Sequence, residues 1–308
     1  METLYLTHPA CRLHDMGQAH PESPERLDAI ADQLLASGII NYIDMGEVRA
    51  PAPDSALTRV HSPAHLQHLQ NLQPSQGFRD IDGDTIMSPH TLEAARYAAG
   101  GVIEAVDAVM AGQAANAFCA VRPPGHHAMP ARAMGFCFFN NIAVGVAHAL
   151  AHHGLKRVAV IDFDVHHGNG TEAIFVDQPQ VLMCSYFQYP LFPGTGIDCL
   201  APNMVNVPVP AYTEGAAIRE LVSAHWLPRL DAHAPEMIFI SAGFDAHRED
   251  DMAQLGLVES DYAWMTEQLM AVADKHASGR IVSVLEGGYN LSALARSVVA
   301  HVRTLAKL

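Results

Sequence analysis

Three side chains able to bind a metal ion stand at alternate positions of one short segment. They are Asp162, Asp164 and His166, within residues 161–170 (Ile-Asp-Phe-Asp-Val-His-His-Gly-Asn-Gly). Alternate side chains of an extended backbone share a face, so these three would converge on one point. Carboxylate oxygens with an imidazole nitrogen suit zinc or ferrous iron and leave room for a water molecule. The segment therefore predicts a catalytic metal site.

A cluster of this kind can also be a solvated loop or the cap of a following helix. Its position favours the metal site, because residues 157–161 (Arg-Val-Ala-Val-Ile) are typical of a buried strand and the acidic pair stands where that strand ends. Binding and catalytic groups of open α/β sheets collect at the carboxyl ends of strands.

Polar segments also follow three other predicted strands. They are residues 122–127 (Arg-Pro-Pro-Gly-His-His), 242–251 and 286–290 (Glu-Gly-Gly-Tyr-Asn). Because the carboxyl ends of parallel strands meet at one edge of a sheet, we expect all four polar segments to form a single site.

A metal-dependent hydrolase needs an open-coordinate metal, groups that move protons and a donor for the developing oxyanion. One carboxylate from residues 245–251 would join Asp164 and His166 as the third ligand, leaving a position for water and a carbonyl. Tyr289 follows two glycines, which allow an unusual backbone path, and its hydroxyl would serve as the oxyanion donor.

The adjacent imidazoles of His126 and His127 would carry the proton chemistry. We expect each ring to be held by a neighbouring acceptor such as Asp162 or Asn169. Pairs of histidines and Gly-Gly-Tyr turns also occur in ordinary loops, so the indication rests on their conjunction with the metal-binding segment.

The elements that would carry these segments alternate between strand and helix. Strands are predicted at residues 4–6, 117–121, 158–163, 181–185, 237–241 and 281–285, and helices near 24–36, 89–110, 141–152, 214–230, 260–275 and 291–305. This pattern predicts an α/β fold with a single doubly wound, mostly parallel sheet sandwiched by helices.

The 308 residues show no linker, so one domain over residues 1–308 is expected. Three segments without periodicity, residues 122–139, 186–210 and 243–257, are long enough to be functional loops.

Composition limits the partners. With 18 Lys and Arg against 33 Asp and Glu, the net charge of −15 argues against nucleic-acid binding. Five cysteines without a Cys-x-x-Cys pair disfavour both a disulfide framework and a thiolate zinc site. The first residues lack the features of a signal peptide, and no apolar run is long enough to span a bilayer. We therefore expect a cytoplasmic protein without a membrane partner.

Five motifs resemble those of the zinc-dependent histone deacetylase superfamily, in the same order and across almost the whole chain. They are residues 20–26 (His-Pro-Glu-Ser-Pro-Glu-Arg), 122–127, 135–141 (Gly-Phe-Cys-Phe-Phe-Asn-Asn), 162–171 and 286–289. The resemblance is to class II and bacterial members, related to acetylpolyamine amidohydrolases, and implies the arginase/deacetylase-like fold.

By this resemblance the zinc ligands are Asp164, His166 and Asp250, with ferrous iron as a possible substitute. Asp250 is preferred to Asp245 and Asp251 because it matches a ligand position five residues after the aspartate of Gly-Phe-Asp. The resemblance also implies that His126 and His127 form the catalytic dyad and that Tyr289 polarises the substrate carbonyl.

Further roles follow from the resemblance alone. Phe136 and Phe192, with Gly135 and Met252, would line a narrow tunnel for the acyl-lysine stem. A structural potassium ion is implied near Asp162, Asp164, His166 and Ser185, with Asn169 close by. Arg26 would lie beside an internal cavity for acetate release, and Asp84 at the rim would orient the substrate backbone.

Three positions depart from related sequences and bear on the substrate. Asn169 stands where class I members carry aspartate, and Asp251 occupies a usual proline position. Met252 lies in the neighbourhood where polyamine-selective eukaryotic members carry a glutamate, and its apolar side chain favours acyl-lysine in proteins or peptides over acetylpolyamines or another small amide. A binuclear manganese ureohydrolase is disfavoured because His126 and His127 fill the region of the second metal. A catalytically silent acyl-lysine binding module is a further alternative, and the oligomeric state is open.

Overall fold

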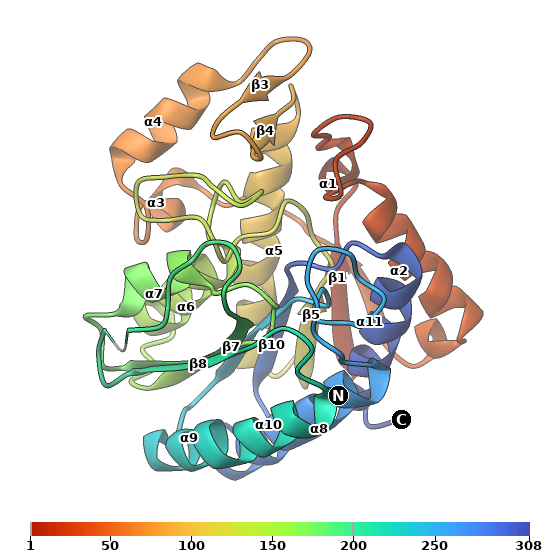
Figure 1. The fold of residues 1–308 in the computed structure, drawn as a ribbon. Coiled ribbons are helices and arrows are strands. Elements are labelled where there is room, and N and C mark those ends of the chain that lie inside the picture. Colours follow the sequence, from red (N-terminus) through yellow and green to blue (C-terminus); the bar gives the residue numbers. More distant parts are fainter. Residues whose placement is uncertain (1, 199) are drawn as a thin grey trace.

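A parallel sheet of eight strands forms the centre of the computed structural model, which describes residues 2–198 and 200–308 (Figure 1). The strands lie in the order β2-β1-β5-β10-β9-β6-β7-β8, and every neighbouring pair is parallel. Their bounds are β1 (Thr3–Thr7), β2 (Asp44–Glu47), β5 (Asn116–Cys119), β6 (Val158–Asp162), β7 (Val181–Gln188), β8 (Met204–Val209), β9 (Ile238–Ala242) and β10 (Ile281–Leu285). A separate antiparallel pair joins β3 (Arg79–Asp80) to β4 (Ile86–Met87).

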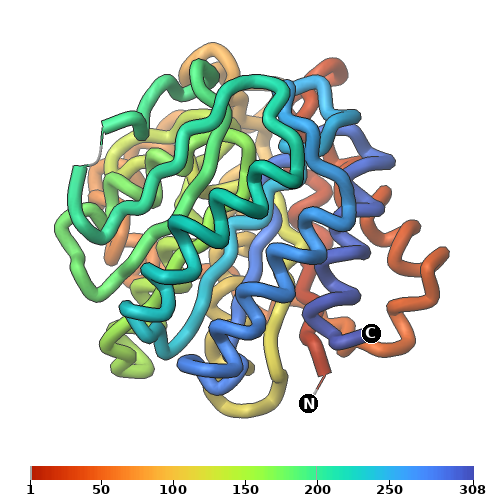
Figure 2. Tube along the Cα trace, turned by 60° about the horizontal axis from the view of Figure 1, so that its bottom comes forward, coloured from red at the N-terminus to blue at the C-terminus, as the bar shows by residue number. Residues whose placement is uncertain are grey.

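Helices cover both faces of the sheet (Figures 1 and 2). One layer contains α1 (Ala10–Leu13), α3 (Asp54–Leu57), α5 (Thr91–Met110), α6 (Asn141–His152) and α7 (Asn169–Phe175). The other contains α2 (Glu25–Ala36), α8 (Gly215–Leu221), α9 (Leu227–His233), α10 (Glu259–His276) and α11 (Leu291–Leu305). A π-helical turn at Val222–Trp226 joins α8 to α9, a 3-10 turn at Ile39–Asn41 follows α2, and α4 (Pro63–Leu72) lies beside the β3-β4 pair.

The expected fold class is confirmed, and the reason is visible in the strands. Every residue of β5, β6, β7, β9 and β10 is buried, because helices cover the sheet on both sides. Such strands are continuous apolar runs in the sequence, which is why residues 158–163 and 281–285 were predictable.

The two edge strands and several short elements were not predicted. β2 is short, acidic and mostly exposed, so it lacks the apolar pattern of a core strand. β8 contains Pro208, which cannot donate to a ladder and is tolerated on an edge strand. α1, α3, α4 and α7, together with the β3-β4 pair, were also missed. Each of these helices has ten residues or fewer, too few for a clear helical period.

Four neighbouring strands, β5, β10, β9 and β6, end at the same edge of the sheet. Asp162 at the end of β6 is in register with Ser185 on β7 and Ser241 on β9, and Leu285 is in register with Ala242. The polar segments expected after residues 121, 163, 241 and 285 therefore leave the sheet side by side.

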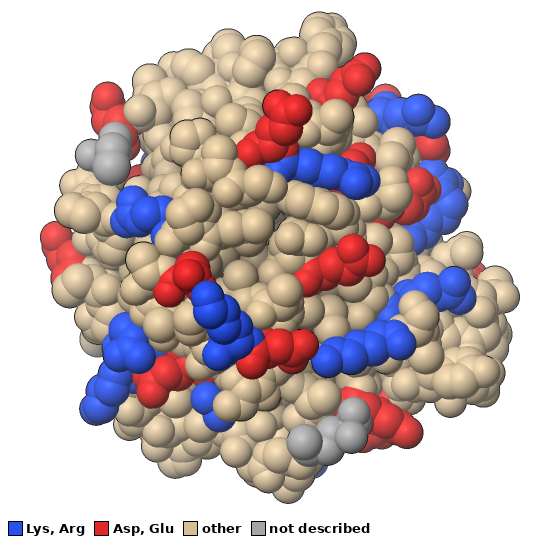
Figure 3. Space-filling model, turned by 90° about the horizontal axis from the view of Figure 1, so that it is seen from below, with Lys and Arg blue, Asp and Glu red and all other residues tan. Residues whose placement is uncertain are grey.

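Three features concern the chain as a whole. None of the helices in the described part of the chain is long and apolar enough to cross a membrane. Cys11, Cys119, Cys137 and Cys184 are buried free thiols, and Cys199 lies outside the described residues. On the face shown in Figure 3, acidic and basic side chains are interspersed among neutral ones. Ion pairs of the chain include Lys275 with Asp231 and Arg219 with Asp261.

Candidate metal centre and catalytic groups

Asp164, His166 and Asp245 form a buried group whose potential ligand atoms all lie within 4.8 Å of one another. His166 Nδ1 is 2.9 Å from Asp164 Oδ1 and 3.2 Å from Asp245 Oδ2. Asp164 and His166 follow β6, and Asp245 lies in the segment after β9, the neighbouring strand. The edge of the sheet thus brings two carboxylates and one imidazole together. The alternating pattern predicted this for Asp164 and His166.

The expectation that Asp250 completes this group is wrong in its geometry. The Asp250 carboxylate faces backbone amides: Oδ2 accepts hydrogen bonds from Tyr289 N (2.6 Å) and Asn290 N (2.9 Å), and Oδ1 accepts one from Met252 N (3.0 Å). Asp250 therefore fixes the turn that carries Tyr289. Asp245 was one of the alternatives from residue types alone, and spacing from the Gly-Phe-Asp segment misdirected the choice.

Two features indicate that these three residues can hold a cation. Asp245 Oδ2 is buried and lies 3.2 Å from His166 Nδ1 without the geometry of a hydrogen bond, which is costly for a carboxylate oxygen unless something else satisfies it. The backbone is also glycine where the carboxylates crowd it. A Cβ atom at Gly243 would lie 2.1 Å from Asp164 Oδ2, and one at Gly287 would lie 2.1 Å from Asp245 Oδ2. These glycines make room for the carboxylates to point inward.

The pKa values of Asp245 and His166 reflect the same crowding of charged groups when no cation is bound. Burial and the neighbouring Asp164 carboxylate raise the pKa of Asp245 to about 7. Although burial alone would lower the pKa of His166, the hydrogen bond to Asp164 and the nearby Asp245 carboxylate raise it to about 10. A divalent cation bound by the same atoms would replace these protons, as happens when a metal site fills. The donor set of two carboxylates and one imidazole fits zinc or ferrous iron.

The imidazoles of His126 and His127 lie beside the metal group, with their ring centroids 4.0 Å apart. His126 Nδ1 donates to Asp162 Oδ2 (2.9 Å), and His127 Nδ1 donates to Asn169 Oδ1 (2.7 Å). Because each ring uses Nδ1 for this hydrogen bond, Nε2 takes no part in it. His126 Nε2 is 3.8 Å from Asp164 Oδ2. The expected partners of the pair are thus those in the structure.

The two imidazoles differ in charge preference. Burial opposes protonation of His126, but the Asp162 and Asp164 carboxylates outweigh it and hold the pKa well above the ordinary value. Burial lowers the pKa of His127 well below that value, and the neighbouring His126 and His166 lower it further. The two carboxylates near His126, against an amide bonded to His127, contribute to this asymmetry.

Glu286 holds the segment of the histidine pair and had no predicted role. Its Oε2 accepts hydrogen bonds from Gly125 N (2.7 Å) and His126 N (3.1 Å), and its Oε1 accepts one from Ser241 Oγ (3.1 Å). Its carboxylate therefore joins the segments after β5 and β10 to β9. The Glu-Gly-Gly-Tyr run contained this residue, but the sequence offers no signal of its distant partners.

Tyr289 lies directly before the cap of α11, where Asn290 Oδ1 accepts a hydrogen bond from Ala293 N (3.0 Å). Burial raises the pKa of Tyr289 well above its ordinary value, so its hydroxyl stays protonated and can donate. The ring packs edge-on against Phe136, with 5.8 Å between centroids. A protonated hydroxyl is what the expected role of oxyanion donor requires, and this role stays a prediction.

Arg26 is fully buried next to Tyr289 and belongs to a larger ionic group. Its guanidinium donates to the carbonyls of Gly288 and Glu286 and to Glu22 Oε1. Glu22 also receives a bidentate contact from Arg122. Two buried cations flank this one carboxylate, which lowers the Glu22 pKa despite burial. Arg26 thus supports the turn of Tyr289, and its expected proximity to a release cavity stays a prediction.

Two aromatic rings flank the histidines and Tyr289. Phe192 packs edge-on against His127 (5.1 Å between centroids) and His166 (6.2 Å), and it is 40% exposed. Phe136 lies at Tyr289 with a backbone φ of 68°, next to Gly135, whose φ is 56°. A Cβ atom at Gly135 would lie 2.6 Å from His127 Cδ2. The structure therefore brings three of the four expected tunnel residues to the site.

The remaining predicted residues lie around this group at different depths. Asp84 accepts a hydrogen bond from Thr85 Oγ1 (2.9 Å), and this hydroxyl accepts one from Phe136 N (3.1 Å), so Asp84 borders the Phe136 side. Met252 is half-buried beside Asp250. Ser185 is buried next to Asp162 on β7, and its hydroxyl donates to the Tyr186 carbonyl (3.3 Å).

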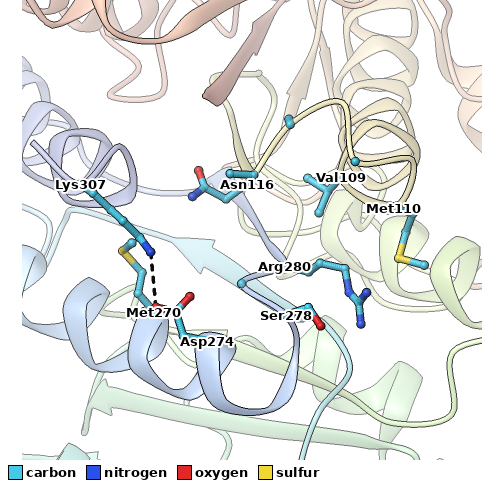
Figure 4. Close-up of a pocket in the computed structure, with 12 residues that line it drawn as sticks. Val109, Met110, Asn116, Met270, Asp274, Ser278, Arg280 and Lys307 are labelled. Carbon is cyan, nitrogen blue, oxygen red and sulfur yellow. Dashed lines mark hydrogen bonds and ion pairs between the residues drawn. The ribbon is translucent and has the colours of Figure 1, made fainter. Parts of the chain in front are cut away.

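A pocket of about 340 Å³ lies at the opposite, amino-terminal edge of the sheet and is not part of this site (Figure 4). Asn116 at the start of β5 and Arg280 just before β10 line it, and Lys307 reaches the Asp274 carboxylate across it (3.4 Å). It lies away from the metal group and the histidine pair, which are at the carboxyl edge.

Comparison with known proteins gives consistent matches. The family described as the histone deacetylase domain matches residues 20–305. The chain is 39% identical to the histone deacetylase-like amidohydrolase of Pseudomonas aeruginosa, covering 88% of this chain and 73% of that protein. It is 36% identical to a probable deacetylase of Archaeoglobus fulgidus (94% and 82% covered) and to the human polyamine deacetylase HDAC10 (95% and 46% covered). Among solved structures, the crystal structure of the HDA15 HD domain has a TM-score of 0.92 at 31% identity, covering 100% of this chain and 90% of that chain.

Proposed function

Because the chain belongs to the histone deacetylase family and is a hydrolase of the deacetylase type, we propose that it removes acetyl or related acyl groups from lysine side chains with one zinc ion. The observation that carries this proposal is the convergence of Asp164, His166 and Asp245 beside the His126 and His127 pair. Asp164, His166 and Asp245 are the proposed ligands, and ferrous iron suits the same atoms.

The bound ion would polarise the amide carbonyl and acidify a water molecule. His127, which its burial and the cationic His126 keep neutral, is the better suited of the two imidazoles to accept the proton of that water. His126, held in its cationic form by Asp162, favours negative charge nearby and is suited to protonate the leaving amine. Tyr289 donates its hydroxyl to the developing oxyanion.

The aromatic rings support an extended, neutral substrate arm. Phe136 and Phe192 would hold a methylene chain between the histidines and Tyr289, since apolar rings bind such a chain without hydrogen-bond demands. The thioether of Met252 offers no charge to a second amine, which favours an acyl-lysine side chain over an acylated polyamine. Asp84 on the Phe136 side is proposed to accept backbone amides of the substrate.

A deacetylase of polyamines is the second candidate. It is favoured by the 36% identity to the human protein named polyamine deacetylase HDAC10. The net charge of −15 would also attract a polycationic substrate.

The deciding experiment measures the release of free amine from acetyl-lysine, trifluoroacetyl-lysine and longer acyl-lysine peptides and from acetylputrescine and acetylspermidine. The purified protein is assayed with one equivalent of zinc and after removal of metal by a chelator. Chelator-sensitive hydrolysis with a higher kcat/KM for the peptides supports the proposal. A higher kcat/KM for acetylpolyamines favours the second candidate, and binding without hydrolysis of any substrate by the zinc-loaded protein would favour a binding module.

Two further parts of this proposal rest on the family resemblance. A potassium ion is proposed near Asp162 and Ser185, which are buried neighbours on β6 and β7. A higher melting temperature in potassium than in sodium chloride of equal ionic strength would support it. A cytoplasmic location is proposed as well, and the four buried free thiols agree with a reducing compartment.

A further inference from the structure

A second group of metal-binding side chains lies between α5 and α6, apart from the catalytic residues. It consists of Asp107 on α5, His148 and His152 on α6, and His153 at the end of α6. His148 and His152 are four residues apart, so they occupy the same face of the helix. We call these four residues the helix-pair cluster.

The atoms of the helix-pair cluster are already close together. Asp107 Oδ1 lies 2.7 Å from both His148 Nε2 and His153 Nε2. Asp107, His148 and His152 each offer a ligand atom, and these atoms lie within 4.8 Å of one another. The rings of His148 and His152 are nearly parallel, with centroids 4.8 Å apart, and His153 packs edge-on against both.

These distances suit a metal ion after a small adjustment. Zinc bonds of about 2.0–2.1 Å place tetrahedral ligand atoms roughly 3.3 Å apart. The two hydrogen-bonded contacts would open by less than 1 Å, and His152 is exposed, so it can turn without disturbing the core. Asp107, His148 and His152 already have ligand atoms within this reach, and His153 Nε2 lies close enough to Asp107 to serve as a fourth ligand.

The protonation states also suit a cation. Burial lowers the pKa of His148, which keeps its ring neutral and able to bind metal. Burial would raise the pKa of Asp107, but its hydrogen bonds with His148 and His153 hold it below the ordinary value, so this carboxylate stays charged. The cluster thus combines neutral imidazole with one negative charge.

We propose that the helix-pair cluster is a second metal site, which binds one zinc ion or another divalent cation that prefers imidazole, such as nickel or copper. It is separate from the catalytic group. The amino-terminal end of α6 faces the catalytic segment, where the cap residue Asn140 donates to the backbone carbonyl of Ala128 (3.3 Å). The cluster lies at the other end of this 12-residue helix, about 18 Å away at 1.5 Å per residue.

The expected consequence is a clamp between two helices of one layer. A metal held by Asp107 on α5 and by histidines of α6 cross-links elements that pack against each other. Because the metal binds the folded chain, it raises the melting temperature in proportion to the logarithm of its concentration above the dissociation constant. The chain would then hold two zinc ions at saturation, one in each group.

The test titrates metal-free protein with zinc in competition with a chromogenic chelator. It is done in an Asp245→Asn background that also carries His166→Gln. These changes remove one proposed catalytic ligand and the imidazole that is common to either choice of the third carboxylate, so the result does not depend on the proposed function. One bound equivalent is expected in this background and none after the further changes His148→Gln and His152→Gln. Cobalt substituted for zinc should give the intense visible absorption of a tetrahedral site only when these histidines are present.

Matched controls make the result specific. The changes His68→Gln and His225→Gln remove two exposed surface histidines and should leave one equivalent bound. The melting temperature of metal-free protein should be similar in all variants, and zinc should raise it only where the cluster is intact. No bound equivalent in the protein with Asp245→Asn and His166→Gln, or one that persists without His148 and His152, would overturn the proposal.

Discussion

The guanidinium of Arg26 lies over the ring of Tyr289, with 4.9 Å between Arg26 Cζ and the ring centroid. The same guanidinium donates to the carbonyl of Gly288 (2.7 Å), and Asp250 accepts from the backbone amide of Tyr289 (2.6 Å). The turn is thus held on two sides by residues far away in the sequence. This support explains how a tyrosine in a Gly-Gly-Tyr loop is kept in one place.

Replacing Tyr289 by Phe removes the proposed oxyanion donor and leaves the ring contacts with Arg26 and Phe136. We expect kcat to fall by about 10²–10³, the loss seen when one such donor is removed. Zinc content should not change, because Tyr289 is not a proposed ligand. Steady-state kinetics and metal analysis check this, with Tyr212→Phe as the control because Tyr212 is 80% exposed. Unaltered turnover in Tyr289→Phe would disprove its role.

Substitution by the amide can distinguish Asp245 from Asp250, the two candidate metal ligands in the segment after β9. Asp245→Asn should lower zinc affinity by more than the 10–100-fold typical of residues that only support a ligand, and activity should be lost with the metal. Asp250→Asn should keep the metal but lower kcat, because its contacts with the amides of Tyr289 and Asn290 weaken. Zinc titration of both variants is the measurement. Loss of zinc from Asp250→Asn with retention in Asp245→Asn would reverse our assignment.

The contact of Gly135 with His127 predicts an effect on activity. Gly135→Ala would place a Cβ atom 2.6 Å from His127 Cδ2, so the imidazole must shift. We expect kcat/KM to fall by about 100-fold, as a 1 Å misplacement can cost. Gly77→Ala is a matched control, because its φ of 70° carries the same backbone strain but its Cβ would meet nothing within 4 Å. Equal activity in the two variants would contradict the prediction.

Glu22 should be essential to stability because it is the carboxylate between Arg26 and Arg122. Glu22→Gln leaves buried guanidinium charge uncompensated, and we expect a loss of about 3–5 kcal/mol in the free energy of unfolding. Urea denaturation measures it, and Asp231→Asn, which breaks exposed pairs with Lys275 and His276, should have little effect. Since the pKa of Glu22 is lowered in the folded state, its contribution is present above the unfolded pKa and is lost as the pH falls below it.

His301 predicts a second pH dependence of stability. It is fully buried between Thr266 and Ser283, and burial lowers its pKa to about 3. An imidazole whose folded pKa is lowered contributes fully above the unfolded value of 6.5 and loses about 1.4 kcal/mol for each pH unit below it. The difference in unfolding free energy between wild type and His301→Gln should therefore shrink from pH 7 to pH 5. A difference that stays constant would exclude this titration.

Much of the fold and two of the three residues of the metal group were predictable because their signals are local. Buried parallel strands are apolar runs, so six of the eight strands in the described sheet were identified. The alternation in the sequence indicated Asp164 and His166, whereas Asp162, the last residue of β6, contacts His126 and is not in the metal group. The partners of the histidine pair were among the expected ones. The edge strands β2 and β8 escaped prediction because they lack that apolar run.

The sequence by itself determined that a metal-binding segment, a histidine pair and a tyrosine follow neighbouring strands of one parallel sheet, because strand period and strand ends are local properties. Only the tertiary structure decided which carboxylate joins Asp164 and His166. The chain after β9 turns so that Asp245 points into the site and Asp250 toward the amides of Tyr289 and Asn290. The pairing of Glu22 with Arg122 and the approach of Asp107 to His148 likewise depend on packing between distant segments, which no local pattern encodes.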